Sequence, residues 1–253
     1  IPTTLLAMVD AAVGGKTGIN FGGLKNEVGA FANARYVIVN TCFLDTLDTA
    51  NLCSGYAEML KHSLISNAQM WAEHVNFDIL QPDLAELQRM VATSIAVKEH
   101  IVADDPHEHG IRKALNFGHT VGHALEEFSM QQPGGAVVSA RLLPLARART
   151  APTKPTSQTP PGTLLHGYAV AFGLIGELYI SARKAGFPTA RLHQTARFIR
   201  ENYGAVAFTC DDYPTLLNLM RHDKKNTSDT INFTLLHDIG DIRINQTATD
   251  EEI

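Results

Sequence analysis

The chain has 253 residues, of which 45% are hydrophobic and 19% charged, with a formal net charge of -5 and a pI near 6.1. This length allows one large or two modest globular domains, and without a basic block we expect neither nucleic acid nor a membrane surface as a partner. Cys42, Cys53 and Cys210 lack CxxC spacing. A disulfide framework and a thiolate zinc site are therefore not expected, and a cytoplasmic location is favoured.

The first part of the chain is typical of an α/β unit, and the remainder is typical of a helical domain. The β-branched run in YVIVN, at Val37–Val39, predicts a short buried strand, and the glycine-rich segment before it predicts a loop. Apolar residues at steps of three and four predict helices over Leu52–Ile65, Asp83–Ala103, Arg112–Met130, His166–Ala185, Thr189–Tyr203 and Tyr213–Arg221.

Two later segments depart from the helical pattern. INFTLL and DIRIN, on either side of Gly240, predict a pair of strands. Residues Gln131 to Thr163 are rich in Pro, Ala, Thr, Ser and Arg and have no recurring apolar face. They predict a flexible insertion that joins two helices, and we assign no chemistry to it.

The segment RKALNFGHTVGH carries an unusual set of polar side chains. In a continuous helix, Arg112, Asn116, His119 and His123 would lie along one stripe. The glycines at positions 118 and 122 cost about 1 kcal/mol each relative to Ala, so a ligand, a metal or a second helix is expected close to this backbone. The alternative is that the histidines are ordinary core or surface residues.

The segment VDAAVGGKTGIN contains GGKT but lacks the earlier glycine of a phosphate loop, since Asp10 stands at that position. A weaker anion cradle remains possible. Backbone amides of the glycine turn and the Lys16 ammonium could form one arm, and Lys25 with Asn26 a second. The alternative is a glycine turn with solvated lysines.

Glu58 lies on the apolar helix GYAEMLKHSLI and needs a partner there, because an isolated buried carboxylate is unfavourable. Lys61 is one possible partner and a metal ion is the other. His166 begins the apolar helix of LLHGYAVAFGL, where it could be a cap, a core residue or a ligand. Together, Glu58, His119 and His166 would make an open catalytic zinc site, whereas HTVGH lacks the glutamate of a HExxH protease.

Six motifs, VDAAVGGKTGIN, GLKN, GYAEMLK, RKALNFGHTVGH, LLHG and RHDKKN, occur in an order that resembles the 3-dehydroquinate synthases of the shikimate pathway. The resemblance spans nearly the whole chain apart from residues 131–163. It implies an α/β plus all-α fold, with residues 1–48 as the end of an NAD-binding α/β domain. Residues 49–253 would form a mainly helical metal- and substrate-binding domain.

The resemblance also implies the site residues. The zinc (or cobalt) ligands would be Glu58, His119 and His166. The substrate would be held by Asp10, Lys16, Asn26, Lys98, Arg112, Asn116, His123 and Lys224, with Lys98 and Arg112 on its carboxylate and Lys16, Asn26, His123 and Lys224 on its phosphate. The nicotinamide end of NAD would contact Thr3, Thr4, Lys16, Lys25, Phe43, Thr46 and Leu47.

The implied reaction converts 3-deoxy-D-arabino-heptulosonate 7-phosphate, a phosphorylated and carboxylated sugar acid, to 3-dehydroquinate and phosphate, with NAD regenerated. We expect most of the dinucleotide-binding part to lie upstream of Ile1, and the full-length protein to be a homodimer. The alternatives are a related metal-dependent polyol dehydrogenase or sugar-phosphate cyclase, and an inactive metal- or anion-binding domain. The pairs Lys98 with Arg112 and Lys16 with Asn26 favour a substrate that bears a carboxylate and a phosphate.

Overall fold

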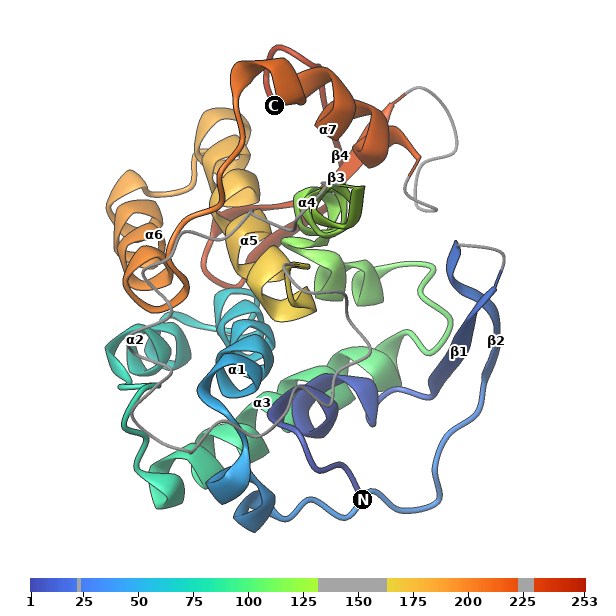
Figure 1. Ribbon diagram of the computed structural model, residues 1–253, viewed down its shortest axis with the longest axis vertical. Coiled ribbons are helices and arrows are strands. Elements are labelled where there is room, and N and C mark those ends of the chain that lie inside the picture. The colour runs from blue at the N-terminus through green and yellow to red at the C-terminus, as the bar shows by residue number, and fades with distance from the viewer. Residues whose placement is uncertain (22–23, 132–162, 223–229) are drawn as a thin grey trace.

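The computed structural model describes residues 1–21, 24–131, 163–222 and 230–253. Most of the predicted insertion therefore lies outside the described residues. The elements, in chain order, are η1 (Ala7–Ala11), β1 (Lys16–Phe21), β2 (Leu24–Phe31), η2 (Thr41–Thr46), α1 (Thr49–Leu64), α2 (Ala68–Asn76), α3 (Leu84–Asp104), η3 (Ile111–Asn116), α4 (His119–Gln131), α5 (His166–Lys184), α6 (Thr189–Tyr203), η5 (Cys210–Asp212), α7 (Tyr213–Arg221), β3 (Ile231–Asp238) and β4 (Asp241–Ala248). Figure 1 shows a helical body around α1 and α5, with the β1–β2 hairpin at one side.

The predicted helical character of the chain beyond residue 49 is confirmed, and so is the strand pair around Gly240. Side-chain caps explain several helix starts. Asp48 accepts a hydrogen bond from the Asn51 amide at 2.9 Å at the start of α1, and Asp83 accepts one from the Ala85 amide at 2.8 Å at the start of α3. The sequence analysis missed α2, which Asn67 caps through the Met70 amide at 2.9 Å.

The predicted helix over residues 112–130 is wrong as a single element. It is divided into the 3-10 helix η3 and the α-helix α4, with Phe117 and Gly118 between them. Gly118 has φ +80°, a left-handed conformation that is strained for residues with a side chain. The four polar residues therefore do not share one helix stripe, because Arg112 and Asn116 lie on η3 whereas His119 and His123 lie on α4.

The N-terminal part also differs from the prediction. The predicted strand at Val37–Val39 is wrong: these residues belong to neither a strand nor a helix, and Ile38 is 61% exposed. The glycine-rich segment is not only a loop, because it contains the antiparallel strands β1 and β2, in which Lys16 is opposite Phe31. A strand needs hydrogen bonds to a neighbour, and in the described residues the hairpin strands pair only with each other.

Helix α1 lies at the centre of the core. Every residue from Leu52 to Leu64 is buried, and α1 contacts α2, α3, α5 and η1. Two glycines allow neighbouring backbone segments to lie very close to each other here. A side chain at Gly55 would collide with the backbone of Leu6, and one at Gly167 would collide with the Ser54 carbonyl. The Gly167 contact sets the start of α5 directly against α1, and the Gly55 contact sets the N-terminal segment against the same helix.

Helices α4 and α5 pack against each other at very short range. A Cβ atom at Gly173 would lie 2.0 Å from the Gly118 carbonyl oxygen and 2.9 Å from the Gly122 Cα. The prediction that the glycines at 118 and 122 permit close approach of a neighbouring element is thus confirmed. Helix α5 contacts α1, α4 and β3, so it connects the central helix to the rest of the C-terminal body.

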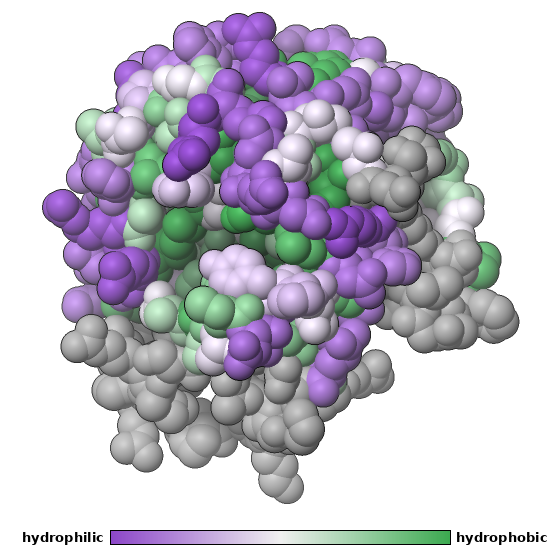
Figure 2. Space-filling model, turned by 90° about the horizontal axis from the view of Figure 1, so that it is seen from above, coloured by the Kyte–Doolittle hydropathy of each residue, from purple (hydrophilic) through white to green (hydrophobic). Residues whose placement is uncertain are grey.

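The surface is mixed rather than uniformly polar. On the face shown in Figure 2, hydrophilic residues surround a hollow in which hydrophobic residues are visible. Among the helices of the described ranges, none combines the length and the apolar character that a membrane span requires.

Candidate metal and substrate site

The three predicted metal ligands converge although they come from three helices. Glu58 is completely buried on α1, and its Oε1 atom lies 3.5 Å from His119 Nε2 and 3.5 Å from His166 Nε2. The ligand atoms of all three lie within 4.8 Å of one another. In tetrahedral coordination with bonds of about 2.0–2.1 Å, neighbouring donor atoms are roughly 3.3 Å apart. The two separations from Glu58 Oε1, at 3.5 Å each, fit that arrangement.

The buried carboxylate itself has an atom that suits a metal. Glu58 Oε2 accepts a hydrogen bond from the buried Lys61 ammonium. Glu58 Oε1 makes no hydrogen bond to any described residue, which is costly for a buried polar atom. Lys61 and a metal ion, the two possible partners of Glu58, are therefore compatible. Lys61 binds one carboxylate oxygen, and the other oxygen remains available for a metal. Oxygen and imidazole nitrogen are both ordinary zinc ligands.

Burial and neighbouring charges shift the pKa of each of the three ligands in opposite directions. Burial alone raises the pKa of Glu58, but the Lys61 ammonium and the imidazoles outweigh it and hold this pKa well below its usual value. Burial lowers the pKa of His119 to about 3, against the opposing influence of Glu58. Burial also lowers the pKa of His166, but the hydrogen bond to Glu126 and the negative charge of the nearby Glu58 raise it overall to about 9.

These pKa values predict that zinc binding near pH 7 releases about one proton. His166 is then protonated and must lose the Nε2 proton, whereas His119 is already neutral and Glu58 already ionised. The apparent zinc affinity should rise roughly tenfold per pH unit up to about pH 9, because the competing proton is lost there. Calorimetry in buffers of different ionisation enthalpy measures the proton count. A zinc affinity independent of pH between 6 and 8 would contradict this assignment.

A second group of charged residues lies on η1 and α3. The Lys98 ammonium donates to Asp10 Oδ1 and to the Asp10 carbonyl, both at 2.6 Å. Burial raises the pKa of Asp10, and Glu58 does so too, but Lys98 and Lys61 reverse this and lower it. The pKa of Lys98 is lowered by burial, which the Asp10 carboxylate partly offsets. The predicted substrate residues Asp10 and Lys98 are thus in direct contact.

The predicted carboxylate-binding residue Arg112 is 2% exposed and pins two backbone turns. Its guanidinium donates to the Pro106 carbonyl at 2.5 Å and to the Gly14 carbonyl at 2.7 Å. The Gly14 contact holds the glycine turn that precedes Lys16. Arg112 therefore orders the proposed anion cradle, and its Nε atom has no hydrogen-bond partner among the described residues.

Glu108 joins two predicted substrate residues and was missed by the sequence analysis. Its carboxylate forms an ion pair with the Lys16 ammonium and accepts a hydrogen bond from Asn116 Nδ2 at 2.7 Å. Glu108 has φ 61°, which is unusual for a residue with a side chain. Nothing in the segment DDPHEHG distinguishes this carboxylate from its neighbours, so only the folded chain identifies it.

His123 lies beside the metal ligands on the next turn of α4. Its ring centroid is 5.3 Å from that of His119 and 5.9 Å from that of His166. The remaining predicted residues are less informative. The side chains of Lys25 and Asn26 and the whole of Lys224 lie outside the described residues.

Most of the predicted nicotinamide contacts lie in or next to two short helical segments, η1 and η2. Thr3 and Thr4 precede η1, and Thr4 Oγ1 accepts a hydrogen bond from the Ala7 amide at 3.2 Å. Phe43 and Thr46 belong to η2, and Leu47 ends it. Their contact with a dinucleotide stays a prediction.

Glu177 fixes the start of the helix that carries His119 and His123, and the sequence analysis did not single it out. Its carboxylate, completely buried on α5, accepts hydrogen bonds from the amides of Gly118, Thr120 and Val121 at 2.7, 2.9 and 3.2 Å. These amides have no partner within α4, and a negative charge at a helix N-terminus is favourable. Glu177 thereby connects the two helices that carry imidazole ligands.

We expect Glu177→Ala to lower the free energy of unfolding of the metal-free protein by about 2–3 kcal/mol, because buried amides at the start of α4 lose a charged acceptor. Glu177→Gln should have a smaller effect, since it retains one acceptor oxygen. Urea denaturation followed by circular dichroism measures the difference. Equal stability of Glu177→Ala and the wild type would show that the carboxylate does not stabilise the helix start.

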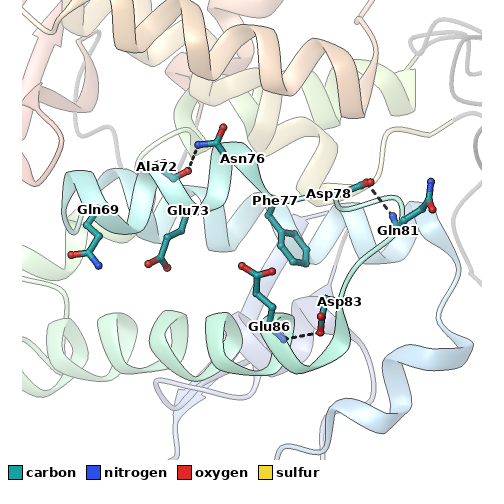
Figure 3. A pocket seen from close by; sticks show the side chains of 9 residues that line it. All are labelled: Gln69, Ala72, Glu73, Asn76, Phe77, Asp78, Gln81, Asp83 and Glu86. Atoms are coloured by element: carbon teal, nitrogen blue, oxygen red, sulfur yellow. Dashed lines mark hydrogen bonds between the residues drawn. The ribbon is translucent and has the colours of Figure 1, made fainter.

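The described part of the chain also has an open pocket of about 520 Å³ between α2 and α3, away from the metal ligands (Figure 3). Its wall is rich in carboxylates and amides, and Arg89 forms an ion pair with Glu73 there at 3.2 Å. The lining residues are Gln69, Ala72, Glu73, Asn76, Phe77, Asp78, Gln81, Asp83 and Glu86. None of the predicted site residues lines this pocket.

Known proteins match this chain over most of its length. A family model described as 3-dehydroquinate synthase C-terminal matches residues 55–146 and 156–226, and one described as 3-dehydroquinate synthase N-terminal matches residues 1–54. A 3-dehydroquinate synthase of Parabacteroides distasonis is 50% identical over 253 residues, which are 100% of this chain and 64% of the relative. One of Bacillus pumilus is 35% identical over 99% of this chain and 61% of the relative. The chain thus spans less than two thirds of these relatives.

Solved structures confirm the predicted fold class. A 2-deoxy-scyllo-inosose synthase complexed with carbaglucose-6-phosphate, NAD+ and Co2+ superposes with a TM-score of 0.75 at 21% identity, over 100% of this chain and 63% of that one. A 2-epi-5-epi-valiolone synthase from Streptomyces hygroscopicus subsp. jinggangensis 5008, with NAD+ and Zn2+ bound, gives 0.74 at 22% identity, over 99% of this chain and 62% of that one. At such identities the likeness concerns the fold alone.

Proposed function

The chain belongs to the 3-dehydroquinate synthase family, and from this premise we propose that it acts in the conversion of 3-deoxy-D-arabino-heptulosonate 7-phosphate to 3-dehydroquinate and phosphate. This is the reaction of a phosphate-eliminating carbon–oxygen lyase. The observation that supports it best is the convergence of His119 Nε2 and His166 Nε2 on the buried Glu58 Oε1, each at 3.5 Å.

Glu58, His119 and His166 would hold zinc or cobalt, and NAD would be the second cofactor. When bound, such an ion supplies Lewis acidity that lowers the pKa of a substrate hydroxyl, and NAD supplies a hydride acceptor that returns the hydride later. The chain contributes the buried setting. Because Glu58 is 0% exposed and His119 only 9% exposed, charge that develops beside them is poorly screened by water.

The substrate carboxylate is assigned to Lys98 and Arg112. Lys98 is nearly buried and forms an ion pair with Asp10. Its ammonium can bind the substrate carboxylate either in place of the Asp10 carboxylate or together with it. In this assignment Asp10 would lie beside the sugar ring, where its carboxylate can accept hydrogen bonds from hydroxyls. Arg112 keeps its two backbone contacts, which hold the turn around Gly14 in the shape of an anion site.

The phosphate is assigned to Lys16, Asn26, His123 and Lys224. Lys16 is half exposed and paired with Glu108, so it must leave that carboxylate to reach the phosphate. The Glu108 carboxylate then keeps its hydrogen bond from Asn116 Nδ2. Cationic and hydrogen-bonding groups at the leaving phosphate stabilise the charge that it carries away, and orient it over the carbon from which the proton is removed.

Turnover of two substrates by the metal-loaded full-length protein tests this proposal. With NAD present, we expect release of inorganic phosphate from the heptulosonate phosphate, inhibition by a chelator, and recovery on addition of zinc. Preferential oxidation of glycerol would support the polyol dehydrogenase alternative instead. Zinc binding without turnover of either substrate would support a non-catalytic metal-binding domain. The homodimer, the cytoplasmic location and the lack of nucleic-acid and membrane partners stay predictions from the sequence.

A further inference from the structure

Glu126 contacts the outer nitrogen of a proposed metal ligand. It lies on α4, is 7% exposed, and its Oε2 atom is 3.0 Å from His166 Nδ1. An ionised carboxylate only accepts hydrogen bonds, so Nδ1 must carry the proton that is donated to Glu126. The other nitrogen, Nε2, faces Glu58 Oε1 at 3.5 Å. Glu126 therefore determines which nitrogen of His166 can present a lone pair to a metal.

We propose that Glu126 is a positioning residue that fixes the tautomer and the orientation of His166 and thereby strengthens metal binding. The inference rests on the metal site of the proposed function, but it concerns a residue that is not one of the three ligands. A carboxylate on the outer nitrogen makes an imidazole more basic and limits its rotation, and loss of such a partner typically weakens metal binding about 10–100-fold.

His119 shows that the two imidazole ligands are supported differently. Its Nδ1 atom is 3.2 Å from the Phe117 carbonyl oxygen, which is also only an acceptor. His119 therefore presents Nε2 as well, but to a neutral partner. Since an ionised acceptor forms the stronger hydrogen bond, Glu126 should influence His166 more than the Phe117 carbonyl influences His119.

The backbone around Glu126 also holds the chain that leads into His166. Ser129 Oγ donates to the Glu126 carbonyl at 2.6 Å and accepts a hydrogen bond from the Leu164 amide at 3.1 Å. The same turn of α4 thus contacts the residue two positions before His166 through Ser129, and His166 itself through Glu126. The N-cap residue Leu165 supplies no side-chain acceptor, so the start of α5 is held by other helices, through these contacts from α4 and through the hydrogen bond of the Gly167 amide to Ser54 Oγ on α1 at 3.1 Å.

A rival arrangement uses the same carboxylate as a ligand. Atoms of His123, Glu126 and His166 also lie within 4.8 Å of one another. In that case His166 would present Nδ1 to the metal, and Glu58 would not be needed. The buried Oε1 atom of Glu58, which has no hydrogen-bond partner in the described part of the chain, favours the first arrangement. The two make opposite predictions for substitutions of Glu58 and Glu126.

The test measures zinc dissociation constants of the metal-free protein by competition with a chelator, for the wild type, Glu126→Ala, Glu126→Gln and Glu58→Gln. Glu127→Gln is the matched control, because Glu127 is the exposed neighbour on the same helix. We expect a dissociation constant about 10–100-fold higher for Glu126→Ala, a smaller increase for Glu126→Gln, which keeps an acceptor for the Nδ1 proton, and no change for Glu127→Gln. Glu126→Gln, which is nearly the same size, also serves if Glu126→Ala does not fold.

Two further readouts separate positioning from a purely structural role. The unfolding free energy of each metal-free variant reports structural loss, and the visible spectrum of the cobalt-substituted protein reports the ligand set. We expect the Glu126→Ala spectrum to keep the wild-type band positions, because the three ligands remain. Unchanged zinc affinity in Glu126→Ala would overturn the inference about Glu126 but not the proposed metal site. Loss of zinc in Glu126→Gln with retention in Glu58→Gln would make Glu126 a ligand, and a wild type that binds no zinc would overturn the proposed metal site as well.

Discussion

Glu58→Gln is expected to lose stoichiometric zinc binding and to lower turnover of the heptulosonate phosphate by about 1,000-fold or more. The buried Oε1 atom lies 3.5 Å from both imidazole nitrogens, and an amide oxygen is a much weaker zinc ligand than a carboxylate. A Lewis acid contributes several kcal/mol of transition-state stabilisation, and about 1.4 kcal/mol corresponds to a tenfold change in rate. Metal analysis after dialysis and a phosphate-release assay measure the two effects.

The buried Lys61 complicates this substitution, because Glu58→Gln leaves its ammonium without the paired carboxylate. Breaking a buried ion pair costs about 3–5 kcal/mol, so the variant could lose metal by unfolding. The double variant Glu58→Gln, Lys61→Met removes both charges and should fold while still lacking zinc. Glu99→Gln, at an exposed position of α3, is the matched control and should retain zinc. Full zinc binding by the folded double variant would refute the role of Glu58.

Lys98→Met is expected to lower kcat/KM for the heptulosonate phosphate by about 100-fold or more. Lys98 is 7% exposed, and loss of a buried charged partner costs about 2–5 kcal/mol. The effect should depend on the substrate carboxylate. With an analogue that carries a hydroxymethyl group in place of the carboxylate, the wild type should be impaired, and Lys98→Met should cause little additional loss.

Lys113→Met is the matched control for Lys98→Met. Lys113 donates to Asn245 Oδ1 at 2.9 Å on an exposed part of the molecule, and its removal should leave kcat/KM nearly unchanged. If Lys98→Met impaired turnover of the carboxylate-free analogue as much as turnover of the natural acid, Lys98 would not bind the carboxylate. The Asp10 contact would then be its main role.

Residue patterns predicted the helices well because most of their information is local. Apolar spacing located α1, α3, α5, α6 and α7 within a few residues of their observed ends. The division between η3 and α4 was not predicted, because the apolar spacing continues across Phe117. The left-handed Gly118 and its contact with Leu174 on α5 decide it, and this contact depends on the fold.

In the exposed N-terminal part, local patterns did not predict the strands correctly. A β-branched run at Val37–Val39 suits a buried strand, but strand formation also requires a hydrogen-bonding neighbour, which cannot be read from composition. The hairpin formed by β1 and β2 was missed for a related reason. Glycines at positions 18 and 29, which face each other in its register, weaken any local strand signal.

The candidate site was predictable in its charged and imidazole residues, and not in the carboxylates that support them. Glu58, His119 and His166 stood out because each is a polar residue on an apolar helix. Glu126 and Glu177 act across the contact between α4 and α5, and their partners are 40 and 56–59 residues away in the sequence. No spacing rule predicts such pairs, because they depend on how the two helices pack.

Anomalous scattering from a zinc-soaked crystal, recorded on either side of the zinc absorption edge, tests the metal site most directly. We expect a single strong peak within about 2.0–2.2 Å of Glu58 Oε1, His119 Nε2 and His166 Nε2, with His166 Nδ1 still directed at Glu126 Oε2. A peak between His123, Glu126 and His166, or none near Glu58, would contradict it.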